Sequence, residues 1–151
     1  MNERSPCIET QMLIRKPASE VFDAFIDPGK TRHFWFTKGS GKLEKGATII
    51  WEWEMYNVST EVHVVDIIPD ELIAITWGSP ATAVDFIFTK RADGHTYIVI
   101  RNYGFEKQGE ALIREIIDLT GGFTTVLDGL KAYMEYGINL NLIADKFPSR
   151  K

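Results

Sequence analysis

Two glutamates in the middle of the chain have a spacing that suits acid–base chemistry. Glu52 and Glu54 are two residues apart in "ATIIWEWEM" (47–55), so in a β-strand their side chains would project from one face. Carboxylates held side by side can shift one another's pKa and act as an acid and a base. The same alternation sets them opposite Trp51 and Trp53, which favours a solvent-facing role. We therefore assign no catalytic residue.

The other side chains that could bind a metal or act as nucleophiles are scattered. Cys7, His33, His63 and His95 do not pair at a metal-ligand spacing, so we expect no metal site. The "GSG" at 39–41 lacks the flanking strand and helix of a nucleophile elbow. No phosphate-binding loop precedes a helix, and we expect no cofactor.

Composition and charge limit the classes of partner. The chain has 151 residues, a net charge of −4 and no block of Lys and Arg, which disfavours nucleic acid and anionic membranes. A single cysteine and the polar start "MNERSPCIET" predict a cytoplasmic protein. No apolar run approaches the roughly 18 to 20 residues that cross a bilayer. We expect one domain over residues 1–151.

The elements that would position a site follow from periodicity. A strand is predicted at 8–15, followed by a short helix from Pro17 to residue 26, a second short segment at 31–36 and a polar, glycine-rich stretch. Five further strands joined by short turns predict an antiparallel meander with one wet face and one buried face, at 47–55, 58–68, 72–77, 81–91 and 96–103.

A long helix is predicted near the C-terminus. Its apolar residues recur in steps of three and four from Leu112 to Ile138, in phase through Gly121 and Gly122. This phase indicates one helix of about 30 residues, roughly 45 Å long, which the two glycines would bend. A bent helix on a curved sheet can hold the sheet without filling the space between them. The sequence therefore predicts an α+β fold with an internal cavity.

Large rings and apolar side chains would line that cavity, on both the sheet and the helix. For any single one of them, core packing is favoured over ligand contact, because aromatic side chains bury large areas wherever they lie. Taken together, their abundance favours an apolar pocket for a small hydrophobic ligand. The predicted ligand-binding residues are Phe34 and Trp35 at the mouth, Trp51, Trp53, Trp77, Phe86 and Phe88 on the sheet, and Phe123, Leu127, Leu130 and Met134 on the helix.

One polar side chain of the last strand would also point into the interior. Arg101 and Asn102 are neighbours, so only one of them can face inward. A polar group there would orient a ligand at the cost of its own desolvation. The register of the strand decides between them, and the sequence leaves both open.

Three segments carry a resemblance to a known family. They are "PASEVFDAFIDPGKTRHFWF" (17–36), "NYGF" (102–105) and "GGFTTVLDGLKAYMEYGINLNLIADKFP" (121–148). With the order of the elements, they resemble the helix-grip fold of the START and birch-pollen-allergen-like superfamily, also called SRPBCC. The third segment is similar to the C-terminal signature of the branch named after the activator of heat-shock protein 90 ATPase, in the form of a bacterial stand-alone domain.

The resemblance implies a curved antiparallel sheet wrapped around a long C-terminal helix, with two short helices after the first strand. It implies a pocket for a small hydrophobic ligand, aromatic or lipid-like. Two alternatives remain open: a cyclase or aromatase that uses the same cavity, and a chaperone-regulating or protein-interaction module. The last would connect the protein with the stress response and with a homodimer.

Overall fold

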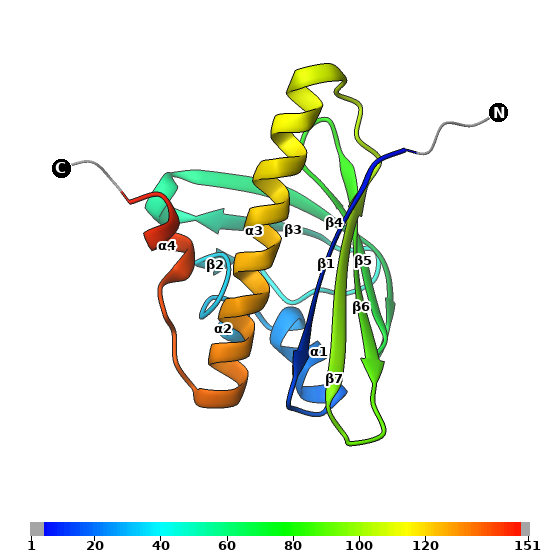
Figure 1. Ribbon diagram of the computed structural model, residues 1–151, viewed down its shortest axis with the longest axis vertical. Coiled ribbons are helices and arrows are strands. Elements are labelled where there is room, and N and C mark those ends of the chain that lie inside the picture. The colour runs from blue at the N-terminus through cyan, green and yellow to red at the C-terminus, as the bar shows by residue number, and fades with distance from the viewer. Residues whose placement is uncertain (1–4, 149–151) are drawn as a thin grey trace.

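Residues 5–148, which the computed structural model describes, form an antiparallel sheet crossed by one long helix (Figure 1). The strand order in the sheet is β1-β7-β6-β5-β4-β3-β2. This is the predicted α+β helix-grip architecture. The strands are β1 (Cys7–Ile14), β2 (Lys38–Gly39), β3 (Thr48–Trp53), β4 (Val58–Ile68), β5 (Leu72–Trp77), β6 (Thr82–Lys90) and β7 (Thr96–Tyr103); the helices are α1 (Ala18–Ile26), α2 (Pro28–Thr31), the 3-10 turn η1 (Glu54–Tyr56), α3 (Gly109–Tyr136) and α4 (Leu142–Lys146).

Alternation along the strands separates a buried face from a wetter one. On β6, Val84, Phe86 and Phe88 are buried, while Asp85 and Ile87 between them are only half-buried. One hydrophobic core is shared by the buried faces of the strands, by α1, by the aromatic segment 34–36 and by the second half of α3. Burial of these faces supplies the main driving force for the fold.

The third strand is shorter than its sequence pattern predicts. β3 ends at Trp53, and η1 together with Asn57, which has a left-handed φ of 53°, turns the chain into β4. Asparagine tolerates that conformation better than most residues. Glu54 therefore leaves the strand and no longer shares a face with Glu52, so the predicted acid–base geometry is wrong. Met55, which continues the alternation of Trp51 and Trp53 in the sequence, is exposed.

The second short helix lies earlier than predicted. The "DPGK" segment ends α1 and also begins α2, because the Asp27 carboxylate accepts a hydrogen bond from the Gly29 N–H at 2.9 Å and Pro28 occupies the first turn. The segment predicted at 31–36 therefore follows the helix. Its three aromatic side chains are buried in the core.

Helix α3 is continuous through both of its internal glycines and is 28 residues long, as the apolar phase predicts. It ends where Gly137 adopts a left-handed φ of 67°, a common helix C-terminus. The predicted stripe runs one residue too far, since Ile138 lies beyond this cap and is exposed. None of the helices within residues 5–148 is both long and apolar enough to cross a bilayer.

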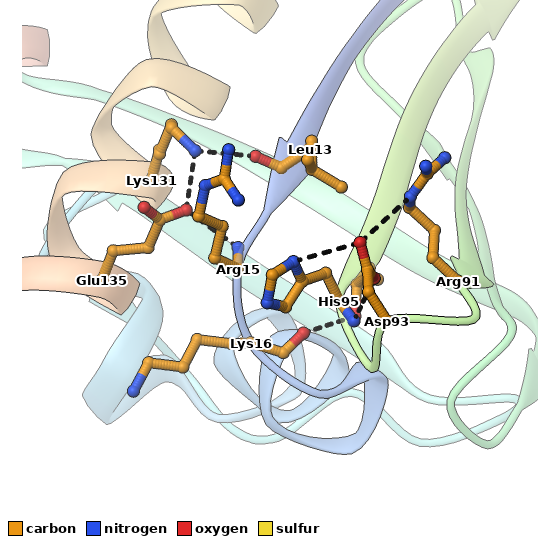
Figure 2. A network of polar contacts seen from close by, with 9 residues as sticks. Leu13, Arg15, Lys16, Arg91, Asp93, His95, Lys131 and Glu135 are labelled. Carbon is orange, nitrogen blue, oxygen red and sulfur yellow. Dashed lines mark hydrogen bonds and ion pairs between the residues drawn. The ribbon is translucent and has the colours of Figure 1, made fainter.

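Side chains of α3 bind the free edge of β1 (Figure 2). Lys131 Nζ donates to the Leu13 carbonyl at 2.9 Å, and the Glu135 carboxylate accepts from the Arg15 N–H at 2.8 Å. Lys131 and Glu135 also form an ion pair of 2.7 Å. Desolvation opposes the charge of Glu135, but hydrogen bonds from Lys131 and Arg15 outweigh it and lower its pKa. These contacts fix the helix against the edge of the sheet.

Candidate ligand-binding cavity

A cavity of about 490 Å³ lies between the first half of α3, the sheet and α4. It is at the end of the sheet where β3 and β5 finish and β4 and β6 begin. Figure 1 shows α4 and the β3–β4 turn on one side of α3 and β1 on the other. The volume is within the range typical of small-molecule sites.

Four aromatic rings form the apolar wall. Trp53 and Trp77 come from the ends of two strands, Trp35 from the segment after α2 and Phe123 from α3. Ring centroids are 5.9 Å apart for Trp35 and Trp77, 6.4 Å for Trp53 and Trp77, and 5.7 Å for Trp77 and Phe123. Such tilted and edge-on arrangements are favourable for aromatic pairs. They give the cavity a wall suited to apolar, ring-containing molecules.

The helix wall has a gap in its side chains at Gly122. A Cβ atom built on this residue would meet no atom within 4 Å, so the missing side chain leaves open space. Leu119 and Phe123 border that space on the same helix. At Gly121 a Cβ would lie 3.5 Å from Lys146 Nζ, which comes from α4. That distance is an ordinary contact with the end of a flexible side chain, so the open space in the helix wall is at Gly122.

The mouth of the cavity is closed on one side by α4 and η1. The Tyr56 hydroxyl hydrogen-bonds the carbonyl of Ile143 and accepts from the Phe147 N–H at 3.3 Å. The rings of Tyr56 and Phe147 are 6.4 Å apart. Ile143, Lys146 and Phe147 all line the cavity. One tyrosine therefore holds the C-terminal wall against the β3–β4 turn.

Ionisable side chains of the lining lie at its rim. Lys107 pairs with Glu115 at 3.6 Å, and Asp118 and Lys146 are exposed. Two cations and two anions give this rim no net charge. An ionised ligand would gain little net attraction from it.

The inward-facing polar residue of β7 is Asn102, which resolves the choice that the sequence leaves open. Asn102 is fully buried, whereas Arg101 faces outward with Glu9 at 3.5 Å. The Asn102 amide nitrogen donates to the Ala83 carbonyl at 2.8 Å and to Thr82 Oγ1 at 3.1 Å. Thr82 lines the cavity and Asn102 does not, so the buried amide hydrogen-bonds a lining residue from outside the cavity.

The structure separates the predicted site residues into three groups. Trp35, Trp53, Trp77 and Phe123 line the cavity. Phe34 borders a second hollow of about 80 Å³ beside α4, and Met134 packs half-buried against the core. The remaining five are buried in the core outside the cavity lining: Trp51, Phe86, Phe88, Leu127 and Leu130.

Several lining residues were not expected from the sequence. Glu115, Asp118, Leu119 and Gly122 lie on one face of α3 at steps of three, one and three. That spacing is typical of one helix face. The face was not recognised in the sequence, because Glu115 and Asp118 make it too polar to resemble an apolar stripe. The α4 residues gave no signal, because they lie beyond Ile138, where the apolar stripe of the long helix ends.

None of the three histidines lines the cavity, and each contacts a neighbouring side chain. His33 stacks on Tyr133 with ring centroids 5.0 Å apart, and burial lowers its pKa. His63 lies 3.1 Å from Glu61, and His95 lies 3.5 Å from Asp93 on the β6–β7 hairpin (Figure 2). Residues 5–148 contain no group of three His, Cys, Asp or Glu side chains placed to hold a metal ion.

Comparison with known proteins identifies one matching family. The family described as "Activator of Hsp90 ATPase homolog 1-like protein" matches residues 15–135, which include most of the sheet and nearly all of α3. No curated protein matches the sequence.

Solved structures share the fold. SSP2350 from Staphylococcus saprophyticus is 27% identical, with a TM-score of 0.78 over 89% of this chain and 96% of that one. The Aha1 dimer from Colwellia psychrerythraea is 14% identical, with a TM-score of 0.74 over 87% and 98% of the two chains. DynU16, from the dynemicin biosynthetic locus, is 18% identical, with a TM-score of 0.79 over 88% of this chain but only 48% of its own.

Proposed function

The chain belongs to the family of Activator of Hsp90 ATPase homolog 1-like proteins, and from this premise we propose that it binds a small hydrophobic ligand between the sheet and α3. The ligand occupies the cavity of about 490 Å³, with its apolar body against Trp35, Trp53, Trp77 and Phe123. It is a compact neutral molecule, because the rim offers no net charge.

One observation carries this proposal. The cavity begins where the buried part of α3 ends, and at that position α3 has Gly122 in place of a side chain. A helix facing a hydrophobic sheet normally fills such a position, because empty apolar space forfeits packing energy. Glycine in a helix interior also costs about 1 kcal/mol relative to alanine. A ligand that fills the space would restore the lost packing contacts, and its binding would explain why glycine is present despite its lower helix propensity.

Two experiments test ligand binding. Mass spectrometry of the purified protein under native conditions should find a co-purifying small molecule. A panel of neutral hydrophobic compounds should raise the melting temperature of the stripped protein, because a ligand that binds only the folded state stabilises it by mass action. The proposal fails if no panel member shifts the melting temperature and no molecule co-purifies.

A matched variant links any binding to the cavity. In Gly122→Leu, the new side chain enters the open space and removes the room for a ligand. The variant should fold with a melting temperature close to that of the wild type and should lose the ligand-induced shift. A shift that survives unchanged in Gly122→Leu places the ligand elsewhere.

Acid–base catalysis in the same cavity has weaker support. Lys107, Asp118 and Lys146 are exposed, where water screens their charges, and the half-buried Glu115 is paired with Lys107. The rest of the lining consists of aromatic and aliphatic side chains, glycine, proline and the hydroxyl residues Thr60, Ser79 and Thr82. A reacting group held against this wall would meet no carboxylate or imidazole.

Self-association is a second candidate property. Ile113 and Ile117 lie one turn apart on α3 and are 57% and 67% exposed. Such an apolar pair on a helix surface suits a protein contact, and one relative of the same fold is described as a dimer. Light scattering after gel filtration should give twice the monomer mass, and Ile117→Lys should return it to the monomer. A monomeric wild type contradicts this candidate without affecting ligand binding.

A further inference from the structure

The buried contact between Asn102 and Thr82 determines which way a hydroxyl group of the cavity wall can hydrogen-bond. Thr82 is the first residue of β6, and Asn102 is near the end of β7. Both are buried, and both face the interior. Only Thr82 belongs to the cavity lining.

The Ala83 carbonyl fixes the orientation of the Asn102 amide. A main-chain carbonyl can only accept a hydrogen bond, so the amide nitrogen must be the atom that lies 2.8 Å from it. The same nitrogen has a second hydrogen, and it points to Thr82 Oγ1 at 3.1 Å. Thr82 Oγ1 is therefore the acceptor in its contact with Asn102.

This assignment leaves the hydrogen of the Thr82 hydroxyl free. A threonine hydroxyl has one donor and two acceptor positions, and Asn102 uses one acceptor position. Within residues 5–148, no side-chain hydrogen bond donated by Thr82 is formed. The hydroxyl can donate to a molecule in the cavity, and the burial of Thr82 limits competition from water at this side chain.

We infer that Thr82, oriented by Asn102, is a specificity-determining hydrogen-bond donor of the cavity. It selects neutral apolar ligands that carry an acceptor oxygen, such as a carbonyl or an ether, over hydrocarbons of the same shape. The inference rests on the proposed function. The rim adds no competing preference, because its two cations and two anions balance.

Two probes of nearly identical shape isolate this contact. 2-Acetylnaphthalene has a carbonyl oxygen where 2-isopropenylnaphthalene has a methylene group. The quantity to measure is the ratio of their dissociation constants, by calorimetry or by quenching of tryptophan fluorescence. Thr82→Val removes the hydroxyl and keeps the branched shape, so it should weaken the ketone by about five- to tenfold relative to the hydrocarbon. Thr82→Ser retains a hydroxyl, so its ratio of dissociation constants should be close to that of the wild type.

Thr10→Val is the matched control. Thr10 is a buried, inward-facing threonine on β1 that lies outside the cavity lining, so the same substitution there should leave the ratio unchanged. If both probes bind but Thr82→Val does not change the ratio, the inference is wrong and cavity binding stands. If neither probe binds the wild type, the inferred ligand class is wrong; if both bind Gly122→Leu as well as they bind the wild type, the proposed ligand site itself is contradicted.

Discussion

Trp77 and Phe123 face each other across the gap between the sheet and α3, with ring centroids 5.7 Å apart and planes inclined by 33°. Beyond Phe123, α3 buries Val126, Leu127 and Leu130 in the core. Before Phe123, Gly122 leaves open space. The Trp77–Phe123 contact therefore marks the boundary between the filled and the hollow part of the interface.

The two sides of this boundary should respond differently to an added methyl group. Gly122→Ala places its Cβ in open space and improves helix propensity, so it should stabilise the fold by about 0.5–1 kcal/mol. At Gly129 the Cβ would lie 3.3 Å from Phe34 Cβ and 3.4 Å from the Phe34 carbonyl oxygen. Gly129→Ala should therefore gain nothing or lose stability. Urea unfolding of both variants measures the difference, and equal gains would contradict it.

Glu135 should give the fold a pH-dependent stability. Its pKa lies below the ordinary value of 4.5 in the folded protein, so its ionised form stabilises the fold above that pH and this stabilisation is lost as pH falls through the folded pKa. Glu135→Gln should cost about 1–2 kcal/mol at pH 7, because the carboxylate is only 7% exposed and binds Lys131. The cost should shrink below pH 4.5.

The control for that measurement is another glutamate on the same helix. Glu110 contacts Arg114 at 3.5 Å, but its side chain is 81% exposed. Glu110→Gln should change the free energy of unfolding by less than about 0.5 kcal/mol at either pH. A Glu135→Gln cost that is independent of pH would show that packing, rather than charge, explains it.

Two buried threonines on the inner face of the sheet should respond oppositely to valine. Thr10 Oγ1 is buried without a hydrogen-bond partner among residues 5–148, so Thr10→Val should stabilise the fold, by up to about 1 kcal/mol. Thr96 Oγ1 donates to the Lys16 carbonyl at 2.7 Å, so Thr96→Val should cost about 1–2 kcal/mol. Thermal or urea unfolding measures both. A cost at Thr10 as large as that at Thr96 would contradict the assignment.

The Tyr56 hydroxyl should control the mobility of α4. Tyr56→Phe removes its bonds to the Ile143 carbonyl and the Phe147 N–H and retains the ring contact. Hydrogen exchange of the amides around α4 should then accelerate severalfold, while amides of the central strands keep their protection. Unchanged exchange at Phe147 would show that this hydroxyl does not hold the C-terminal wall.

Sequence patterns predicted the fold well because the buried periodicities are long. Steps of three and four extend over most of α3, and alternation extends along β6 and β7. The cavity lining was predicted less well. Alternation shows that Trp51, Phe86 and Trp77 share a face of the sheet, but not where along α3 the interface opens. That position depends on Gly122 and on the docking of α4.

The β3–β4 turn was mispredicted for a local reason. The alternation of Trp51, Glu52, Trp53, Glu54 and Met55 has no break in residue type, so a strand over all of them satisfies the pattern. The chain turns there because η1 and the left-handed Asn57 shape the connection to β4, and Tyr56 bonds α4. A contact 87 residues away in sequence cannot be recognised from a short window.

Ligand binding in the cavity can be tested directly with the four tryptophans. Trp35, Trp53 and Trp77 line the cavity, whereas Trp51 is fully buried outside its lining. A titration with 2-acetylnaphthalene, followed through the four indole N–H signals by NMR, should shift the first three saturably and Trp51 least, and Gly122→Leu should abolish the shifts. Indole signals that stay fixed throughout the titration, or that shift equally in Gly122→Leu, would contradict a ligand site between the sheet and α3.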